Sequence, residues 1–149
     1  MNFKPIGIVK STSTEPVDEN WGHVVSEIHL AEALAQGLRG LEQFSHLIVV
    51  FCMHQATFNL STDLVRRPRR RADMPELGIF AQRAKHRPNP IGITAVELVG
   101  TAGNVLKVKG LDAIDGTPVL DLKPYVPVFD RMDKAIVPEW MDRLMEGYF

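Results

Sequence analysis

Short runs of β-branched and aromatic residues, separated by turn residues, constrain this chain more than any other feature. A further alternating run follows Asp115-Gly116, a dipeptide typical of tight turns. Closely spaced strands without long intervening helices favour a barrel or sandwich over alternating βαβ units. The sequence therefore predicts a mainly β fold, an antiparallel barrel with a few short helices and not a Rossmann sheet. The expected strands are residues 3–9, 23–30, 45–53, 78–81, 92–99, 105–111 and the run after 116.

Residues 45–53 are apolar on both faces, so this run is expected to pair with a strand on each side. Cys52 lies inside the run and is interpreted as a small buried side chain. In the run after residue 116, alternation places Asp121 and Lys123 opposite Leu120 and Leu122. Helices are expected at residues 31–36 and 138–146, the second with a proline in its first turn.

The 149 residues are expected to form one domain, with the barrel at roughly 4–130 and a helix at 138–146. No apolar run reaches the length of a membrane span, and no basic segment precedes an apolar stretch near Met1. We therefore expect a cytoplasmic protein. The five histidines lack the spacing of metal ligands, so no metal is expected. Signatures of nucleophile elbows, P-loops and dinucleotide folds are missing.

A basic stretch runs from Arg66 to Arg87, with seven arginines and one lysine against two carboxylates. Such segregation suits a polyanionic partner, although a solvated or carboxylate-pairing surface is the alternative. Residues 55–77 are expected to be a long excursion without clear structure, either functional or mobile. The stretch ends in Arg87-Pro88-Asn89-Pro90, whose prolines stiffen the backbone. Both a binding site and a rigid connector are open interpretations of this turn.

The chain closely resembles the TsaA-like family, also called TrmO, in four sequence motifs. These motifs are RPNPIGIT at residues 87–94, DGTPVLDLKPY at 115–125, FSHLIVVF at 44–51 and PIGIV at 5–9. Members of that family are S-adenosylmethionine-dependent tRNA adenosine N6-methyltransferases. The resemblance implies a homodimeric β-barrel whose loops grip the methyl donor at the barrel mouth. It also implies tRNA as the partner, with the threonylcarbamoyl form of the adenosine beside the anticodon as acceptor.

Carried over by the resemblance, the methyl-donor site comprises Asp18, Glu19, Asn20, His54, Gln55, Arg83, Ile93, Asp115, Gly116, Thr117 and Pro118. In physical terms, Arg83 can pair with the methionine carboxylate and Ile93 can pack on the adenine. The backbone amides of residues 115–117 are further candidate donors to the ligand.

Methyl transfer to the acceptor nitrogen requires that this nitrogen lose a proton, and Asp121 is the candidate base. Its alternative role is a salt bridge with Lys123 or with an arginine of the basic stretch. Tyr125 is a second catalytic candidate, because it follows a strand at its exit. Candidate RNA contacts are Arg66, Arg67, Arg69, Arg70, Arg71, Lys85 and Arg87.

Aromatic residues could stack an unpaired base; Tyr125 and Trp21 are candidates, whereas Phe80 is expected in the core. Two other functions fit the same residues. One is a non-catalytic RNA-binding barrel, and the other is a methyltransferase acting on a small metabolite.

Overall fold

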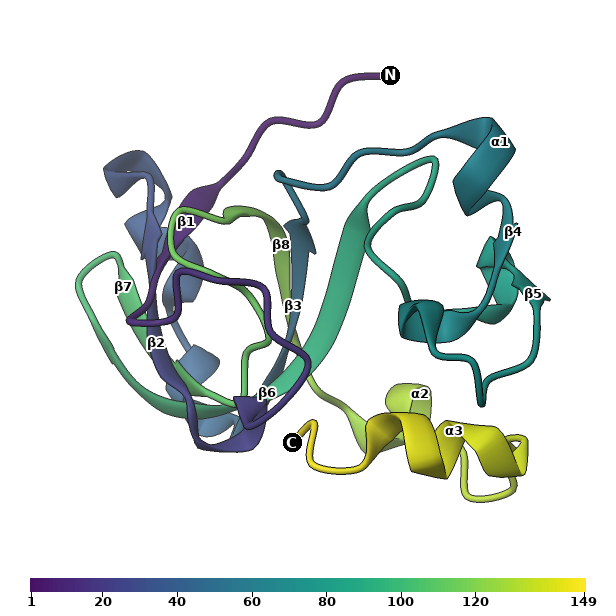
Figure 1. Ribbon diagram of the computed structural model, residues 1–149. Coiled ribbons are helices and arrows are strands. Elements are labelled where there is room, and N and C mark those ends of the chain that lie inside the picture. Colours follow the sequence, from purple (N-terminus) through teal and green to yellow (C-terminus); the bar gives the residue numbers. More distant parts are fainter.

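In the computed structural model, which describes residues 1–149, six antiparallel strands close into a barrel. Their order around the barrel is β1-β2-β7-β6-β3-β8, and Figure 1 shows them as a ring. The predicted mainly β barrel is confirmed. The strands are β1 (Gly7–Lys10), β2 (Val25–Leu30), β3 (His46–Cys52), β6 (Ile91–Ala102), β7 (Val105–Lys109) and β8 (Pro118–Pro124).

The barrel interior is a cluster of 13 buried apolar residues, to which every strand contributes and to which Leu38, Leu111 and Ala113 add from outside the strands. In β3 the side chains of Leu47, Val49 and Phe51 point into this core, while the intervening residues face outward. This alternation is what a sheet with one buried face requires. The expectation that β3 pairs on both sides is also confirmed, since it lies between β6 and β8. Cys52, expected to be buried, is only half-buried at the end of β3.

A β-bulge modifies the predicted pattern in β8. Val50 pairs with Asp121 but the next residue, Phe51, pairs with Val119, so Leu120 is an extra residue in the ladder. As a result the Val119 side chain is fully buried in the core and Leu122 packs against the core. Leu120 is neither a core residue nor one that packs against the core. The expectation that Leu120 and Leu122 share one face was therefore wrong.

Residues 56–90 form a lobe beside the barrel, on the β3–β6 side in Figure 1. The lobe contains α1 (Leu60–Asp63), 3-10 turns and a small sheet of β4 (Val65–Arg66) and β5 (Leu77–Gly78). The excursion thus has structure of its own, contrary to expectation. Of the strand predicted at residues 78–81, Gly78 ends β5, whereas residues 79–81 form a 3-10 turn that buries Ile79.

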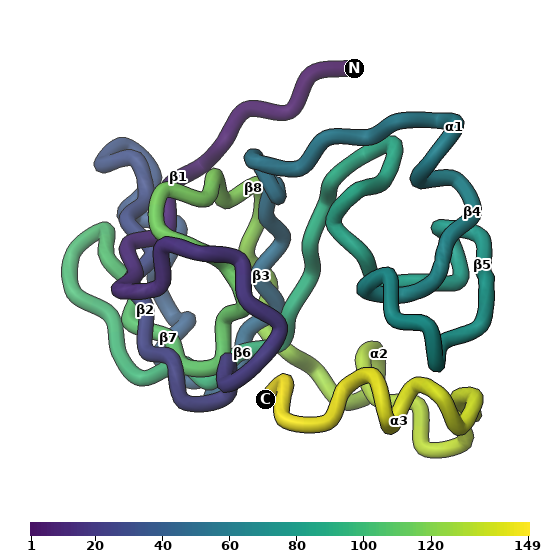
Figure 2. The backbone as a smooth tube through the Cα atoms, in the orientation of Figure 1, coloured from purple at the N-terminus to yellow at the C-terminus, as the bar shows by residue number.

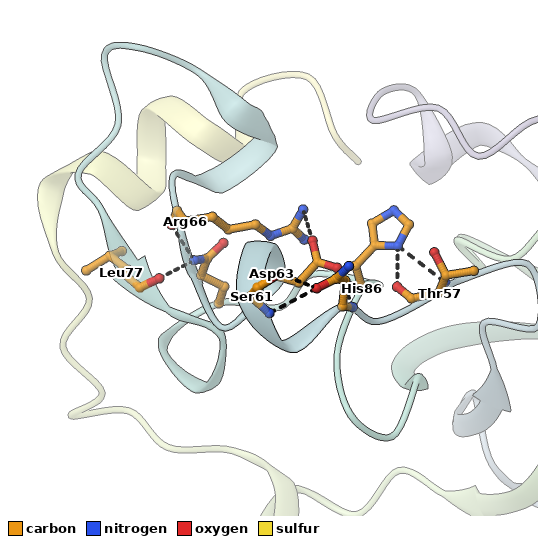
Figure 3. Close-up of polar contacts among 8 residues, drawn as sticks. Thr57, Ser61, Asp63, Arg66, Leu77 and His86 are labelled. Carbon is orange, nitrogen blue, oxygen red and sulfur yellow. Dashed lines mark hydrogen bonds and ion pairs between the residues drawn. The ribbon is translucent and has the colours of Figure 1, made fainter.

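The Gln82 side chain holds the lobe together. Its amide donates to the carbonyls of Arg66 and Leu77, at 2.8 and 2.9 Å, and so clamps β4 to β5 (Figure 3). These two bonds explain how so short a two-stranded sheet persists, because two-residue strands alone are marginal in water.

The helical segments are short. The predicted helix at 31–36 is a 3-10 helix at Glu32–Leu38, and the helix predicted at 138–146 is α3 (Glu139–Met145), preceded by Pro138. A further short helix, α2 (Pro127–Asp130), follows β8, and both α2 and α3 lie below the barrel and lobe in Figure 1. None of these helices has the length and apolar character needed to cross a membrane.

Candidate functional site

One end of the barrel gathers most of the predicted methyl-donor residues. β3 ends there at Cys52, which pairs with Ile91 at the start of β6, and β8 begins there at Pro118, which pairs with Ile8. The loops after β1 and β3 and before β6 and β8 therefore meet at this end, which we call the barrel mouth. In Figure 1 the loops after β1 and before β8 cross the open end of the ring.

The Asp115–Thr117 turn lies against the first loop. The Asp115 carboxylate accepts from the backbone N–H of Ser11 at 3.0 Å, and Gly116 takes a φ of 78°, which suits glycine. The amides of Asp115, Gly116 and Thr117 donate to the carbonyls of Ser13, Val9 and Ile114. Since all three amides are used within the protein, a ligand at this turn would meet side chains and carbonyls instead.

Arg83 and Ile93 are in direct contact. The Arg83 guanidinium donates from Nη2 to the carbonyl of Ile93 at 2.7 Å, which ties the lobe to β6. The Ile93 side chain remains 49% exposed on the outer face of the barrel wall. An exposed aliphatic side chain can pack on a flat ring, and the guanidinium beside it can bind a carboxylate of the same ligand.

His54 and Gln55 form an exposed turn after β3, beside the entry to β6. The backbone N–H of Met53 donates to the carbonyl of Pro90 at 2.8 Å, so the two loops run together. Farther along, His86 Nδ1 lies 2.7 Å from the Thr57 carbonyl oxygen (Figure 3). These contacts place the predicted His54, Gln55, Arg83 and Ile93 along one side of the mouth.

The first loop, which carries Asp18, Glu19 and Asn20, contacts the lobe through Asp18 and the C-terminal segment through Asn20. Asp18 Oδ2 lies 3.6 Å from Arg69 Nε, and the Asn20 backbone N–H donates to the carbonyl of Gly147 at 2.8 Å. Asn20 also takes a φ of 61°, a left-handed conformation that asparagine tolerates better than most residues. All three side chains are exposed.

Asp121 lies on the outer wall of the barrel. Across the sheet it pairs with Val50, which pairs in turn with Ile93, so all three side chains point the same way. The salt bridge to Lys123, left open by the sequence, is present at 2.8 Å. Tyr125 is half-buried just beyond β8, where its backbone N–H donates to the carbonyl of His46.

Most of the candidate RNA contacts have partners inside the protein. Arg66 is turned inward, with 13% of its side chain exposed and Asp63 at 3.6 Å (Figure 3). Arg67 donates to the Met74 carbonyl, and Arg71 holds Asp73 at 2.7 Å. This Arg71 hydrogen bond lowers the pKa of the Asp73 carboxyl below its ordinary value.

Two candidate RNA contacts remain free of such partners. The side chains of Arg70 and Lys85 make no hydrogen bond or ion pair within the chain, whereas Arg87 donates to the carbonyl of Gln82 at 3.2 Å. The sequence alternative of a carboxylate-pairing surface is thus seen at Arg66 and Arg71, while Arg70 and Lys85 stay available to a polyanion.

Two aromatic residues exchange the roles expected of them. Phe80, expected in the core, is 77% exposed on the lobe, and Trp21, a candidate stacking residue, is 2% exposed. The Trp21 indole N–H donates to the Val17 carbonyl at 2.9 Å, which anchors the first loop. Phe80 is therefore accessible to a base and Trp21 is not.

Asp112, Thr94 and Tyr148 form a polar contact that sequence reasoning missed. The Tyr148 hydroxyl donates to Asp112 Oδ2 at 2.6 Å, and Thr94 Oγ1 donates to Asp112 Oδ1. Burial, and next the nearby Asp112 charge, raise the pKa of Tyr148, so its hydroxyl stays protonated. Thirty-six positions separate Asp112 from Tyr148, and no motif in the sequence links them.

Two open depressions on the surface include residues described above. One, of about 500 Å³, lies beside the Asp115 turn, and the other, of about 530 Å³, lies between the lobe and α3 and contains none of the predicted methyl-donor residues. No group of three or more potential metal-ligating side chains comes together. The first depression is lined by Lys10, Ser11, Thr12, Val25, Ser26, Glu27, Lys107 and Asp115.

Comparison with known families adds a relationship that covers most of the chain. Residues 9–131 match the tRNA-methyltransferase O N-terminal domain. The chain is 36% identical over 146 residues to a probable S-adenosyl-L-methionine-binding protein from Pyrococcus abyssi, which covers 95% of this chain and 76% of that protein. It is 39% identical over 144 residues to the tRNA (adenine(37)-N6)-methyltransferase of Escherichia coli, covering 89% of this chain and 61% of the enzyme.

A solved structure supports the same relationship. The crystal structure of TrmO from Pseudomonas aeruginosa superposes with a TM-score of 0.75 at 35% identity, covering 91% of this chain and 60% of that one. The chain thus spans about three fifths of the solved TrmO chain and of the Escherichia coli enzyme.

Proposed function

Because this chain belongs to the family of the tRNA-methyltransferase O N-terminal domain, we propose that it is an S-adenosylmethionine-dependent methyltransferase acting on tRNA. The acceptor that we propose is the N6 nitrogen of threonylcarbamoyladenosine beside the anticodon. The name of the Escherichia coli relative specifies adenine 37 and its N6 position, which supports this choice of atom. An RNA substrate is also consistent with a cytoplasmic protein.

The observation that carries the proposal is the contact between Arg83 and Ile93 at the barrel mouth. Arg83 uses only Nη2 to hold the Ile93 carbonyl, so its other N–H groups can bind a carboxylate. Next to it, Ile93 and Ile91 are 49% and 42% exposed, an apolar surface suited to an adenine ring. These residues fit the two ends of S-adenosylmethionine.

The chain's contribution to catalysis would be mainly positioning. S-adenosylmethionine supplies a methyl group already activated on a sulfonium, so no covalent help from the protein is required. Holding two reactants at attack distance can lower a barrier by roughly 7 to 11 kcal/mol. Arg83 and Ile93 would orient one reactant, and the exposed ring of Phe80 on the adjoining lobe would stack the unpaired adenine.

Asp121 is the proposed base. It lies on the same outer face as Ile93, two strands away, which corresponds to about 10 Å between backbones. A nucleoside between these two strands could therefore reach both residues. One oxygen of the Asp121 carboxylate accepts a hydrogen bond from the Leu122 backbone N–H, which fixes the orientation of the carboxylate.

We further propose that the protein works as a homodimer. The chain exposes 9813 Å², whereas a compact monomer of 16.7 kDa typically exposes about 7,600 Å². The surplus of about 2,200 Å² exceeds the roughly 800 Å² that each partner buries in a standard interface. Residues 128–137 supply apolar area for it, with Val128, Phe129, Met132, Ile136 and Val137 each more than half exposed.

A calorimetric titration with S-adenosylmethionine tests the methyl-donor site. We expect micromolar binding by the unmodified protein, and a loss of about tenfold or more in Arg83→Ala, because a charge-assisted hydrogen bond contributes about 1.5 to 3 kcal/mol. Arg39→Ala is the matched control: Arg39 is exposed beyond the opposite end of the barrel. Absence of binding in the folded protein would contradict the proposal.

Methyl transfer is then assayed with tRNA that carries threonylcarbamoyladenosine and with the same tRNA lacking that modification. Transfer to the modified tRNA alone supports the proposed acceptor. Binding of the donor without transfer to either RNA would favour an RNA-binding barrel without catalysis, and transfer only to small nucleosides would favour a metabolite methyltransferase.

A further inference from the structure

Residues 147–149 lie between the barrel, the first loop and the lobe. The backbone N–H groups of Asn20 and Trp21 donate to the carbonyls of Gly147 and Tyr148, each at 2.8 Å. On the barrel side, the Tyr148 hydroxyl binds Asp112 at 2.6 Å. Figure 2 shows this yellow segment ending beside the purple first loop.

Tyr148 also contacts the lobe. The Arg69 guanidinium lies 5.5 Å from the centre of the Tyr148 ring, within the range of a cation–π interaction. The same guanidinium has Asp18 of the first loop at 3.6 Å. A continuous set of contacts thus runs from Asp112 through Tyr148 and Arg69 to Asp18, one of the residues that the family resemblance assigns to the methyl-donor site.

Left-handed backbone conformations occur on both sides of this set. Arg69 and Arg70 take φ values of 49° and 55°, and Asn20 takes 61°, all in the left-handed region. Arginine is rarely found there, and such conformations persist only where surrounding contacts hold them. Arg69 has two such contacts, Tyr148 and Asp18. The left-handed conformation of Arg69 is therefore held by contacts that include the Tyr148 ring.

We propose that Tyr148 is a positioning residue that fixes the first loop against the barrel and couples it to the arginine-containing lobe. Loop ordering follows from the contacts alone. Its consequence for methyl-donor affinity rests on the proposed function, because it requires that Asp18, Glu19 and Asn20 contact the donor. Since the same ring holds Arg69, a ligand that moves the lobe is expected to change the affinity for a ligand at the first loop.

The test compares Tyr148→Leu with Tyr148→Phe by amide hydrogen exchange at Asn20 and Trp21, without ligand, and by calorimetry with S-adenosylmethionine. Tyr148→Leu removes the hydroxyl and the ring, so we expect exchange to be about tenfold faster and the donor to bind about tenfold more weakly. Tyr148→Phe keeps the ring beside Arg69 and loses only the hydroxyl, so we expect amide exchange to be about threefold faster and the donor to bind about threefold more weakly. Arg69→Met, which keeps Tyr148 intact, should also speed exchange at Asn20.

Val108→Ala is the control for a general loss of stability, because Val108 is fully buried in the barrel core. It should lower the unfolding midpoint while leaving exchange at Asn20 and Trp21, and donor affinity, within about twofold of the unmodified protein.

Exchange within about twofold of the unmodified protein in Tyr148→Leu would overturn the inference. Faster exchange with unchanged donor affinity would overturn the positioning role. If the unmodified protein binds no donor but exchange responds as expected, the proposed function fails and the loop-ordering role of Tyr148 stands.

Discussion

Asp121 and Lys123 form an ion pair of 2.8 Å on the outer side of β8. The hydrogen bond that Lys123 donates to Asp121 raises the pKa of the Lys123 ammonium, so this ammonium stays protonated near neutral pH.

If Asp121 is the base, Asp121→Asn should lower the single-turnover rate of methyl transfer by about 100-fold or more while leaving the donor dissociation constant unchanged. Lys123→Met is the matched variant: it breaks the ion pair but keeps the carboxylate, and should retain activity. Equal rates of methyl transfer in Asp121→Asn and the unmodified protein would contradict the role of Asp121 as the base and would indicate that it serves only in the ion pair with Lys123.

Gly92 should not tolerate a side chain. It pairs with Phe51 across the sheet, and an added methyl group would overlap the Phe51 ring, which is buried in the core. We expect Gly92→Ala to reduce the free energy of unfolding by about 1 to 3 kcal/mol in urea denaturation. Gly100→Ala on the same strand meets open space and should be neutral or mildly stabilising. A neutral Gly92→Ala would show that the Phe51 ring moves freely.

The lobe should lose stability in acid through Asp73. The hydrogen bond from Arg71 depresses the folded pKa of this carboxyl, so its contribution is present above the unfolded value and is lost as pH falls through the folded pKa. The thermal midpoint should therefore fall less steeply below about pH 4 in Asp73→Asn than in the unmodified protein. The difference is expected to be small because the pair is exposed. Identical curves would show that the pair contributes nothing to folding.

RNA affinity should depend on Arg70 and Lys85. Each substitution to Ala is expected to reduce the slope of log affinity against log salt concentration by about 0.7 to 0.9, the effect of one lost phosphate contact. Arg66→Ala should instead lower stability, since that side chain is turned inward beside Asp63. Filter binding across a salt series measures the slopes. Unchanged slopes in Arg70→Ala and Lys85→Ala would show that these two residues of the lobe do not contact RNA phosphates.

Dimerisation should depend on the apolar residues after β8. Sedimentation velocity is expected to show a dimer that Ile136→Glu dissociates, because Ile136 is 95% exposed and a buried unpaired carboxylate opposes association. Val99→Glu, at a half-exposed position on β6, is the control and should remain dimeric. A monomer in the unmodified protein would contradict the proposal.

Local patterns in the sequence were enough to predict the barrel. Alternation and the Asp115-Gly116 turn predicted β8, and the two-sided apolar run predicted that β3 pairs on both sides. The bulge at Leu120 was not predictable in the same way, because it arises from pairing with β3 and not from the order of residues in β8.

The lobe and the Tyr148 contacts depend on tertiary structure. The two-residue strands β4 and β5 are too short to produce a pattern, and the Gln82 amide that clamps them lies outside both. Phe80 and Trp21 show the same limit, because the local sequence does not predict whether an aromatic side chain will be buried or exposed. Motif resemblance predicted a set of residues for the methyl-donor site, but not that Arg83 would contact the Ile93 carbonyl.

Barrel closure has a consequence for how the protein is made. The last strand of the barrel to emerge, β8, pairs with both β1 and β3, and it joins Val119 and Pro118 to Gly7 and Ile8 of β1. More than a hundred residues must leave the ribosome between these partners, and until then β1 and β3 each keep an unpaired edge. Loop-closure entropy makes such distant pairings slow. The nascent chain is therefore most open to aggregation, and most in need of a chaperone, just before β8 emerges.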